Sequence, residues 1–418
     1  MTFELHDAAD LDLTRWVRPG DGVLWSQACS EPTALVDRLI EQADDLGALD
    51  LYCGHTFRDV LTDPRAAGFT VTSHGALGRL GQIARRRQVN IVPTHYSELP
   101  ALFARRALPS DVTLLQVAPP DTSGRCSFGM DAGYVADAVR HARVVIAEVN
   151  ERMPSLPGDG IDLADIDVAV HTDRDPLEAP QARPTAADEA VADRVAALVR
   201  DGDTLQIGVG GIPDAVMRRL GHLHDLGLHS GIISDSVIDL IETGVLNGAR
   251  KTADRGRAVA GSALGTSRLV EFLSSTADVD VRAVSYTHRP DVLAQVGRLV
   301  AVNGAIEIDL TGQVNSESIG DRWVGAVGGQ VDFLRAARAS GGLGIVALPS
   351  TVERSGATRI VPTLSGPVTT ARSDVDIVVT EHGVARLGGL DLKQRADALI
   401  AVADPRHRDT LDRAAGAR

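Results

Sequence analysis

Short apolar runs alternate along the chain with longer amphipathic stretches, and this alternation constrains the fold more than any other feature. Several runs are rich in valine, isoleucine and leucine and are apolar on both faces, as is typical of parallel strands covered on both sides. The stretches between them have the character of crossover helices, so the sequence predicts an α/β fold of repeated strand–helix units. The runs expected to form strands are Val112–Val117, Val144–Val149, Thr204–Gly208, Leu299–Val302, Gly344–Leu348 and Val375–Val379.

The chain has 418 residues, more than a single hydrophobic core usually serves, so two domains are expected. Segment Thr172–Ala190 interrupts the alternation with three prolines, many charges and no apolar periodicity. We interpret it as a linker or surface crossover, after which Val191–Arg200 resumes as a helix. The predicted domains are residues 1–180 and residues 186–418, both α/β.

The charge balance disfavours a nucleic-acid partner, because 56 acidic against 42 basic side chains give a net charge of −14. Only two of the basic residues are lysines, Lys251 and Lys393. A phosphate site in this chain is therefore expected to use arginines and backbone amides.

The three cysteines, Cys29, Cys53 and Cys126, are widely separated and form no C-x-x-C motif. We therefore expect neither a disulfide framework nor a metal site. Met1–Asp7 lacks the basic start and apolar run of a signal peptide, and no apolar stretch approaches the length of a membrane span. We expect a cytoplasmic protein with no membrane partner.

A first glycine-rich turn, LQIGVGGIPDA at residues 205–215, follows an apolar run and precedes Val216–Leu220, which can start a helix. Glycine at such a turn permits unusual dihedral angles and close approach of a ligand, and a following helix offers free N–H groups to an anion or oxyanion. Taken alone, G-x-G-G is a weak signal, and an isolated instance is more often a tight turn without a ligand. The candidate ligand-binding residues are Gly208, Gly210, Gly211 and Ile212.

A second glycine turn, at residues 324–333, again precedes a predicted helix, and its candidate ligand-binding residues are Gly328, Gly329 and Gln330. The alternative is a structural loop. Just upstream, Asp309–Asn315 adds a third cluster of amide, hydroxyl and glycine positions, which is unusual for packing alone.

From Ser26 to Leu411 the chain resembles the acetyl-CoA hydrolase/transferase family, particularly its 4-hydroxybutyrate CoA-transferase-like branch. So many ordered matches are improbable by chance. Besides the two glycine turns, they include Ala28–Pro32, Pro93–Pro100, Leu115–Asp121, Ala147–Asn150, Asn303, Ile306–Gly312, Pro349–Thr351, Arg359–Pro362 and Thr380–Ala385.

The resemblance implies two related open-sheet domains of the CoA-transferase type with an acyl-CoA site between them. It also implies that CoA is a substrate or product and not a permanent cofactor, that a small carboxylic acid can be a second substrate, and that the protein is a homodimer or larger homo-oligomer. In the family the glycine turns lie near the thioester and the coenzyme.

One residue departs from the family pattern. The family segment reads roughly G-[IL]-H-[ST]-E-x-[IF]-S-D, and its glutamate attacks the acyl-CoA to form an acyl-glutamyl anhydride. Here Gly231 stands at that position, while His229, Ser230, Ser234 and Asp235 match their counterparts. Glycine cannot act as a nucleophile, but it leaves room for water or a bulkier acyl group.

Other residues must then supply the chemistry. His229 is the best-placed candidate base, with His382 and His95 behind it, although a lone histidine is more often structural. Asp235 either orients that imidazole or caps the following helix. Further carboxylates, each expected to be structural or solvated, are Glu31, Glu98, Glu242, Glu307, Glu317 and Glu381.

Three functions fit these observations. The first, which we favour, is water-dependent hydrolysis of an acyl-CoA at its thioester or at a C–C bond. The second is CoA transfer between carboxylic acids by a non-standard route, and the third is CoA-ester binding without catalysis.

Overall fold

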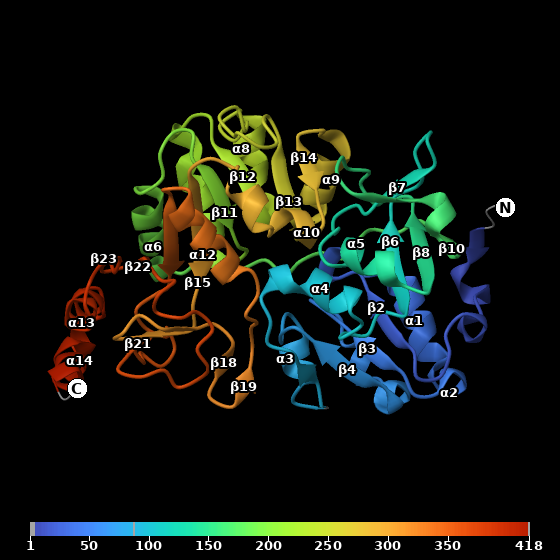
Figure 1. Ribbon diagram of the computed structural model, residues 1–418, viewed down its shortest axis with the longest axis horizontal. Helices are drawn as coiled ribbons and strands as arrows, with labels where there is room; N and C mark the ends of the chain where they lie inside the picture. The colour runs from blue at the N-terminus through green and yellow to red at the C-terminus, as the bar shows by residue number, and fades with distance from the viewer. Residues whose placement is uncertain (1–4, 87, 417–418) are drawn as a thin grey trace. The chain divides into compact units, whose positions relative to one another are not determined.

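The computed structural model describes residues 5–86 and 88–416 (Figure 1). Its contacts divide the chain into unit 1, Met1–Pro180 with Val259–Arg289, and unit 2, Gln181–Ala258 with Pro290–Arg418. The first change of unit lies within the predicted linker, whereas the return of Val259–Arg289 to unit 1 was not anticipated. The domain limits 1–180 and 186–418 stay a prediction. Residues 1–4, which begin the segment Met1–Asp7, and residues 417–418 lie outside the described residues.

Unit 1 contains a parallel sheet with strand order β1-β10-β8-β6-β2-β3-β4-β5. The central strands are buried along their whole length, as their apolar sequences predict. The strands are β1 Leu5–Asp7, β2 Gly22–Trp25, β3 Asp50–Tyr52, β4 Thr70–Ser73, β5 Asn90–Ile91, β6 Val112–Val117, β8 Val144–Asn150 and β10 Val168–Thr172.

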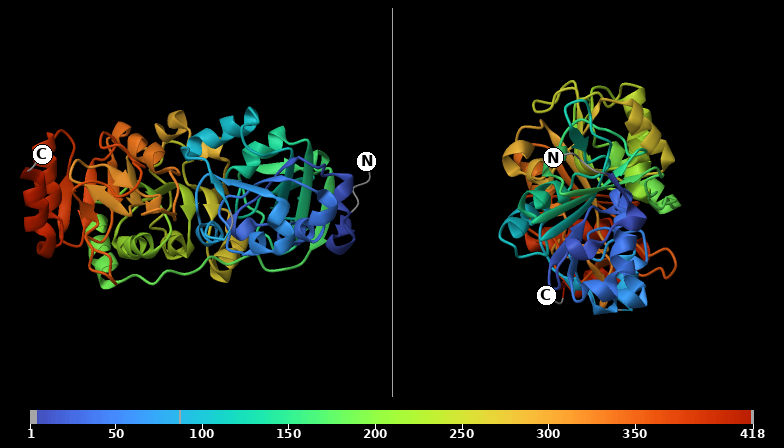
Figure 2. Two further views of the ribbon diagram at one scale, coloured as in Figure 1. Left: turned by 90° about the horizontal axis from the view of Figure 1, so that it is seen from below. Right: turned by 90° about the vertical axis from the view of Figure 1, so that its right-hand side faces the viewer.

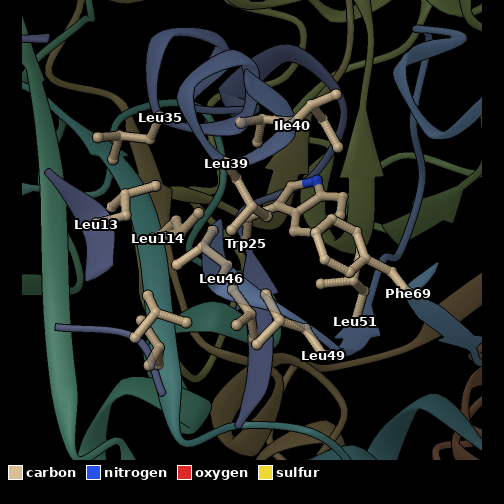
Figure 3. Close-up of a cluster of buried hydrophobic side chains, with 14 of the residues drawn as sticks. Leu13, Trp25, Leu35, Leu39, Ile40, Leu46, Leu49, Leu51, Phe69 and Leu114 are labelled. Carbon is tan, nitrogen blue, oxygen red and sulfur yellow. The ribbon is translucent and has the colours of Figure 1, made fainter. Parts of the chain in front are cut away.

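One face of this sheet forms a hydrophobic core around Trp25, which is 1% exposed (Figure 3). Helix α1, Thr33–Glu41, contributes Leu35, Leu39 and Ile40 to it, at the spacing of one helical face. The other elements of unit 1 are α2 Ala43–Leu46, α3 Leu80–Ile83, α4 Leu99–Ala104, β7 Arg125–Ser127, α5 Val135–Ala138, β9 Gly160–Asp162, β13 Ala258–Ala263 (which begins at the unit boundary), α9 Ser267–Ser275, β14 Val279–Val281 and α10 Val284–Thr287.

In unit 2, neighbouring strands follow the order β12-β11-β15-β20-β22-β23, parallel except for the last pair. They confirm the predicted α/β class. These strands are β11 Thr204–Ile207, β12 Gly227–Ile233, β15 Leu299–Gly304, β20 Leu343–Ala347, β22 Ile377–Thr380 and β23 Gly383–Arg386.

Short ribbons and helices complete unit 2, and α13 and α14 lie side by side near the C-terminus (red in Figures 1 and 2). The ribbons are β16 Glu307–Asp309, β17 Val314–Asn315, β21 Ile360–Val361, β18 Ser318–Ile319 and β19 Arg322–Trp323. The helices are α6 Ala186–Ala196, α7 Gly211–Arg219, α8 Ile238–Glu242, α11 Pro290–Leu293, α12 Gln330–Ala339, α13 Leu392–Ala401 and α14 Pro405–Gly416.

Two predicted helix limits were wrong. Helix α6 begins at Ala186, inside the predicted linker, because Thr185 and Asp188 form a reciprocal capping box there, and it ends at Ala196. Helix α7 begins directly at Gly211. Among the described residues, no helix is long and apolar enough to cross a membrane.

Candidate functional site

Strands β11 and β12 bring Gly208 and Gly231 together. The two strands are parallel, and Thr204 pairs with Gly227. Advancing by the same number of residues along each strand places Gly208 opposite Gly231. The side chain of Ser230 holds this register, because its Oγ donates to the carbonyl of Ile207 at 2.8 Å. The carboxyl ends of parallel strands are where open α/β sheets bind ligands.

Alternation along β12 places His229 and Gly231 on one face and Ser230 on the other. The His229 side chain is fully buried, and Gly231 is half-buried. A side chain at position 231 would project from the same face as the imidazole. The structure therefore groups two of the three predicted catalytic positions on one strand face.

Asp235 does not have the capping role considered for it. Ser234 is the N-cap of the 3-10 turn Asp235–Val237, with its Oγ accepting from Ser236 N at 3.4 Å. The Ser234 hydroxyl also donates to Oδ1 of Asp214 at 2.9 Å. Burial raises the pKa of Asp214, while the serine hydrogen bonds oppose that shift. The hydroxyl thus couples α7 to the end of β12, and the carboxylate of Asp235 is not needed for the cap.

The first glycine turn borders open space. Among the described residues, apart from its two chain neighbours, no heavy atom lies within 4 Å of a Cβ added to Gly208, and its φ is outside the left-handed region, so packing does not require glycine there. Gly210 has a φ of 121°, which does favour glycine. A Cβ on Gly211 would lie 3.2 Å from Oδ2 of Asp188, and Ile212 is buried. Gly208 is therefore the residue of this turn that neither packing nor backbone conformation requires to be glycine.

The second glycine turn leads into the ten-residue helix α12. Gly328 has a φ of 59° and open space around it, and Gly329 is the N-cap without a side-chain capping bond. Gln330 is 8% exposed, and its Oε1 accepts from Ser316 Oγ at 3.2 Å. Its Nε2 has no hydrogen-bond partner among the described residues. A buried amide donor without a protein partner calls for an explanation, such as a hydrogen bond to a ligand or water.

The third predicted cluster, Asp309–Asn315, is held by hydrogen bonds among its own residues. Oδ1 of Asp309 accepts from the backbone N and Oγ1 of Thr311 at 2.9 and 2.7 Å, and its Oδ2 accepts from Nε2 of Gln313 at 2.9 Å. These groups satisfy one another within the turn, so its composition has a structural explanation.

Hydrogen bonds occupy most of the alternative carboxylates. In unit 2, Glu307 accepts from the backbone N of Ser365, Glu317 from Oγ1 of Thr369, and Glu381 from N and Oγ of Ser350. The Glu381 Oε1 also lies 3.5 Å from Nε2 of His382. Glu242 is exposed. These are the structural and solvated roles expected for them.

In unit 1, Glu31 is fully buried and accepts from Oγ1 of Thr56 at 2.7 Å and from Arg58 at 3.3 Å. Burial raises its pKa, and those two partners oppose the shift. Glu98 is exposed. The half-buried His95 has an Nδ1 without a partner in the described part of the chain.

Two polar pairs in unit 2 were not predicted from the sequence. One is Ser316 with Gln330. The other joins β11 to β15, where Nδ2 of Asn303 donates to Oε1 of Gln206 at 2.9 Å. A glutamine inside the apolar run of β11 was the available signal for it.

Within residues 5–86 and 88–416, no three His, Cys, Asp or Glu side chains are arranged to hold a metal ion. Cys29, Cys53 and Cys126 are buried, and none of the three is in a disulfide within the described residues.

Two family models match the chain. The acetyl-CoA hydrolase/transferase N-terminal domain matches residues 8–179, and the C-terminal domain matches residues 265–415. The 4-hydroxybutyrate coenzyme A transferase of Clostridium kluyveri is 38% identical, over 93% of this chain and 92% of that protein. The acetyl-CoA hydrolase of Candida albicans is 32% identical, over 47% of this chain and 37% of that protein.

Solved structures agree. A 4-hydroxybutyrate CoA-transferase from Porphyromonas gingivalis has a TM-score of 0.81 at 32% identity, covering 98% of this chain and 96% of that one. RipA from Yersinia pestis has a TM-score of 0.92 at 31% identity, covering 99% and 97%. The chain therefore belongs to the acetyl-CoA hydrolase/transferase family and has the fold of its CoA-transferases.

Proposed function

We propose that this chain is an acyl-CoA-processing enzyme that hydrolyses its substrate, at the thioester or at a C–C bond, with water in place of an enzyme carboxylate. Family membership supports acyl-CoA as the substrate class, with CoA as a product and not a resident cofactor. The observation that carries the choice of hydrolysis is the glycine at position 231, level with the open turn at Gly208.

In the thioester case, water occupies the volume that a glutamate side chain would fill. Its oxygen attacks the thioester carbonyl while His229 accepts its proton. The tetrahedral intermediate then collapses, the C–S bond breaks, and the CoA thiolate takes the proton back from the imidazolium. The products are a carboxylic acid and free CoA.

Backbone and amide donors are proposed to hold the anionic groups. The N-terminus of α7 lies beside Gly208, and the N-terminus of α12 carries Gln330 with its free Nε2. Helix N-termini favour anions, and donors already in place stabilise a developing oxyanion. Gly208, Gly210, Gly211, Ile212, Gly328, Gly329 and Gln330 are the proposed binding residues.

CoA transfer is the second candidate, favoured by the relatives that are named CoA-transferases. In that case a bound carboxylic acid takes the place of water and attacks the thioester directly. CoA-ester binding without catalysis is the third candidate. A cytoplasmic homodimer or larger homo-oligomer stays a prediction.

A glycine-to-alanine pair tests the binding site. Gly208→Ala adds one methyl group into open space, so the melting temperature should match the wild type while acetyl-CoA affinity falls about tenfold or more, or about 1.4 kcal/mol. Gly221→Ala is the matched control, because Gly221 also has open space around its Cβ but lies past the C-terminal end of α7.

Calorimetric titration with acetyl-CoA and longer acyl-CoAs reads out both variants. Equal affinity in both variants and the wild type would remove the first glycine turn from the site. A wild type that binds neither CoA nor any acyl-CoA would overturn the proposed function itself.

A further inference from the structure

The hairpin β18–β19 is rooted at the N-terminus of α12. Val324 and Gly325, which follow β19, both donate their backbone N–H to the carbonyl of Glu317 at 2.8 and 3.0 Å. The residue before Glu317 is Ser316, whose Oγ contacts Gln330. The base of the hairpin is therefore fixed next to the free Nε2 of Gln330, and its tip is exposed.

The two faces of this hairpin differ. Ser318 pairs with Trp323, and Ile319 pairs with Arg322, so Trp323 shares a face with Ser318 while Ile319 is on the other. On the Ser318 face, a Cβ added to Gly366 would lie 2.6 Å from Ser318 Oγ. Val368 follows Gly366 by two residues in the sequence.

Trp323 is 37% exposed and Val368 is 50% exposed, whereas Trp25 is 1% exposed. An exposed indole is unusual in a chain whose aromatic content is only 3%. The exposed indole offers a planar aromatic surface on the hairpin.

The sheet order places α12, at whose N-terminus the hairpin begins, away from the reacting end of the proposed site. Gly231 lies on β12, Gly208 follows β11, and α12 packs on β15 and β20, the next strands in the order. Adjacent strands are about 4.8 Å apart, so β12 and β15 are separated by about 10 Å. A coenzyme whose thioester lies at Gly231 and whose diphosphate meets the N-terminus of α12 would extend its nucleoside toward the hairpin.

We propose that the Trp323 face of the β18–β19 hairpin binds the purine end of coenzyme A by stacking. This proposal rests on the proposed function, because it assumes an acyl-CoA at Gly231 and Gln330. The indole stacks on the purine. The hairpin thereby distinguishes a full CoA ester from a shorter thioester that lacks the nucleotide.

The test compares acetyl-CoA with acetyl-pantetheine in binding to Trp323→Ala, Trp323→Phe and Ile319→Ala. Aromatic stacking on a base contributes about 1–3 kcal/mol, so Trp323→Ala should weaken acetyl-CoA binding about 5- to 150-fold. Acetyl-pantetheine binding should stay at the wild-type level. Trp323→Phe should restore most of the affinity, and Ile319→Ala, on the opposite face, should resemble the wild type.

Adenosine 3′,5′-bisphosphate provides a second readout. It should quench wild-type tryptophan fluorescence, and this quenching should be absent in Trp323→Phe. Unchanged acetyl-CoA affinity in Trp323→Ala, or equal weakening for acetyl-pantetheine, would overturn the stacking proposal and leave the proposed function intact. Failure of the wild type to bind any CoA ester would instead overturn the function on which the proposal rests.

Discussion

The Oγ of Ser230 donates a hydrogen bond of 2.8 Å to the carbonyl oxygen of Ile207, and the backbone N of Ile207 donates back to that Oγ at 3.3 Å. This exchange joins the last residue of β11 to the residue before Gly231. The open glycine turn after β11 and the residue at position 231 are therefore held level by one buried hydroxyl.

Ser230→Ala should destabilise the protein by about 1–3 kcal/mol, because Ser230 is fully buried and its loss deprives the Ile207 backbone of a partner. Urea unfolding measures the change. Ser274→Ala, on the exposed face of α9, should stay within about 0.5 kcal/mol of the wild type. Equal stability of the two variants would show that the hydroxyl does not hold this register.

Gly231→Glu should raise CoA transfer from acetyl-CoA to a small carboxylic acid, because it supplies the carboxylate that an anhydride mechanism needs. Gly231→Gln is the control, since it has the same shape without a nucleophilic oxygen. Transfer is measured as the new CoA ester formed. A Gly231→Glu protein that binds acetyl-CoA but gains no transfer over Gly231→Gln would contradict the assignment of this position.

His229→Asn should lower the turnover of acyl-CoA by about 100- to 10,000-fold, the usual effect of losing a general base. The affinity for acyl-CoA should change far less, because the imidazole is assigned to the water and not to the coenzyme. Steady-state kinetics with calorimetric binding separates the two effects. His141→Asn, an exposed substitution in unit 1, should behave like the wild type. Wild-type turnover in His229→Asn would move the search to Glu31, Glu98 and Glu381.

Acid should destabilise unit 1 through His74. Burial, with a smaller contribution from His55, lowers the pKa of His74 to about 4. Between about pH 6.5 and pH 4 the unfolded chain binds a proton that the folded chain does not, so stability falls as the pH falls. The full effect is about 3 kcal/mol, since one pKa unit corresponds to about 1.4 kcal/mol.

His74→Asn cannot titrate there, so the wild type should lose stability relative to it between about pH 6.5 and pH 4. Unfolding at several pH values gives this difference. If the free energies of unfolding of the two proteins change with pH in parallel, His74 does not titrate as its burial requires.

Much of the fold was predictable because parallel strands buried on both faces leave a clear apolar signature. β6 matches its predicted run, and β8 extends only one residue beyond it. Helix α6 begins earlier in the chain than predicted, because a capping box forms inside a segment whose composition predicts a linker. The assignment of Val259–Arg289 to unit 1 depends on long-range contacts, which a local pattern does not encode.

The candidate site was only partly predictable. Glycine turns mark the strand ends, but only the structure shows that Gly208 has no packing reason to be glycine. Ser234 and Asp235 are adjacent and both types of side chain can cap a helical turn, so the sequence did not show which of them is the N-cap. In the structure the N-cap is Ser234. The contact of Ser316 with Gln330 joins residues on either side of a hairpin, so it required the hairpin to be known.

The most direct test of the central claim is the fate of the acyl group and of CoA in ¹⁸O-labelled water. The wild-type protein is incubated with an acyl-CoA and a small carboxylic acid, and the products are followed by mass spectrometry. The account predicts free CoA in equal amount to an acid that carries one solvent oxygen, with no acyl or CoA adduct on the protein. Formation of a new CoA ester of the added acid, with little free CoA and no solvent label in the released acid, would contradict it.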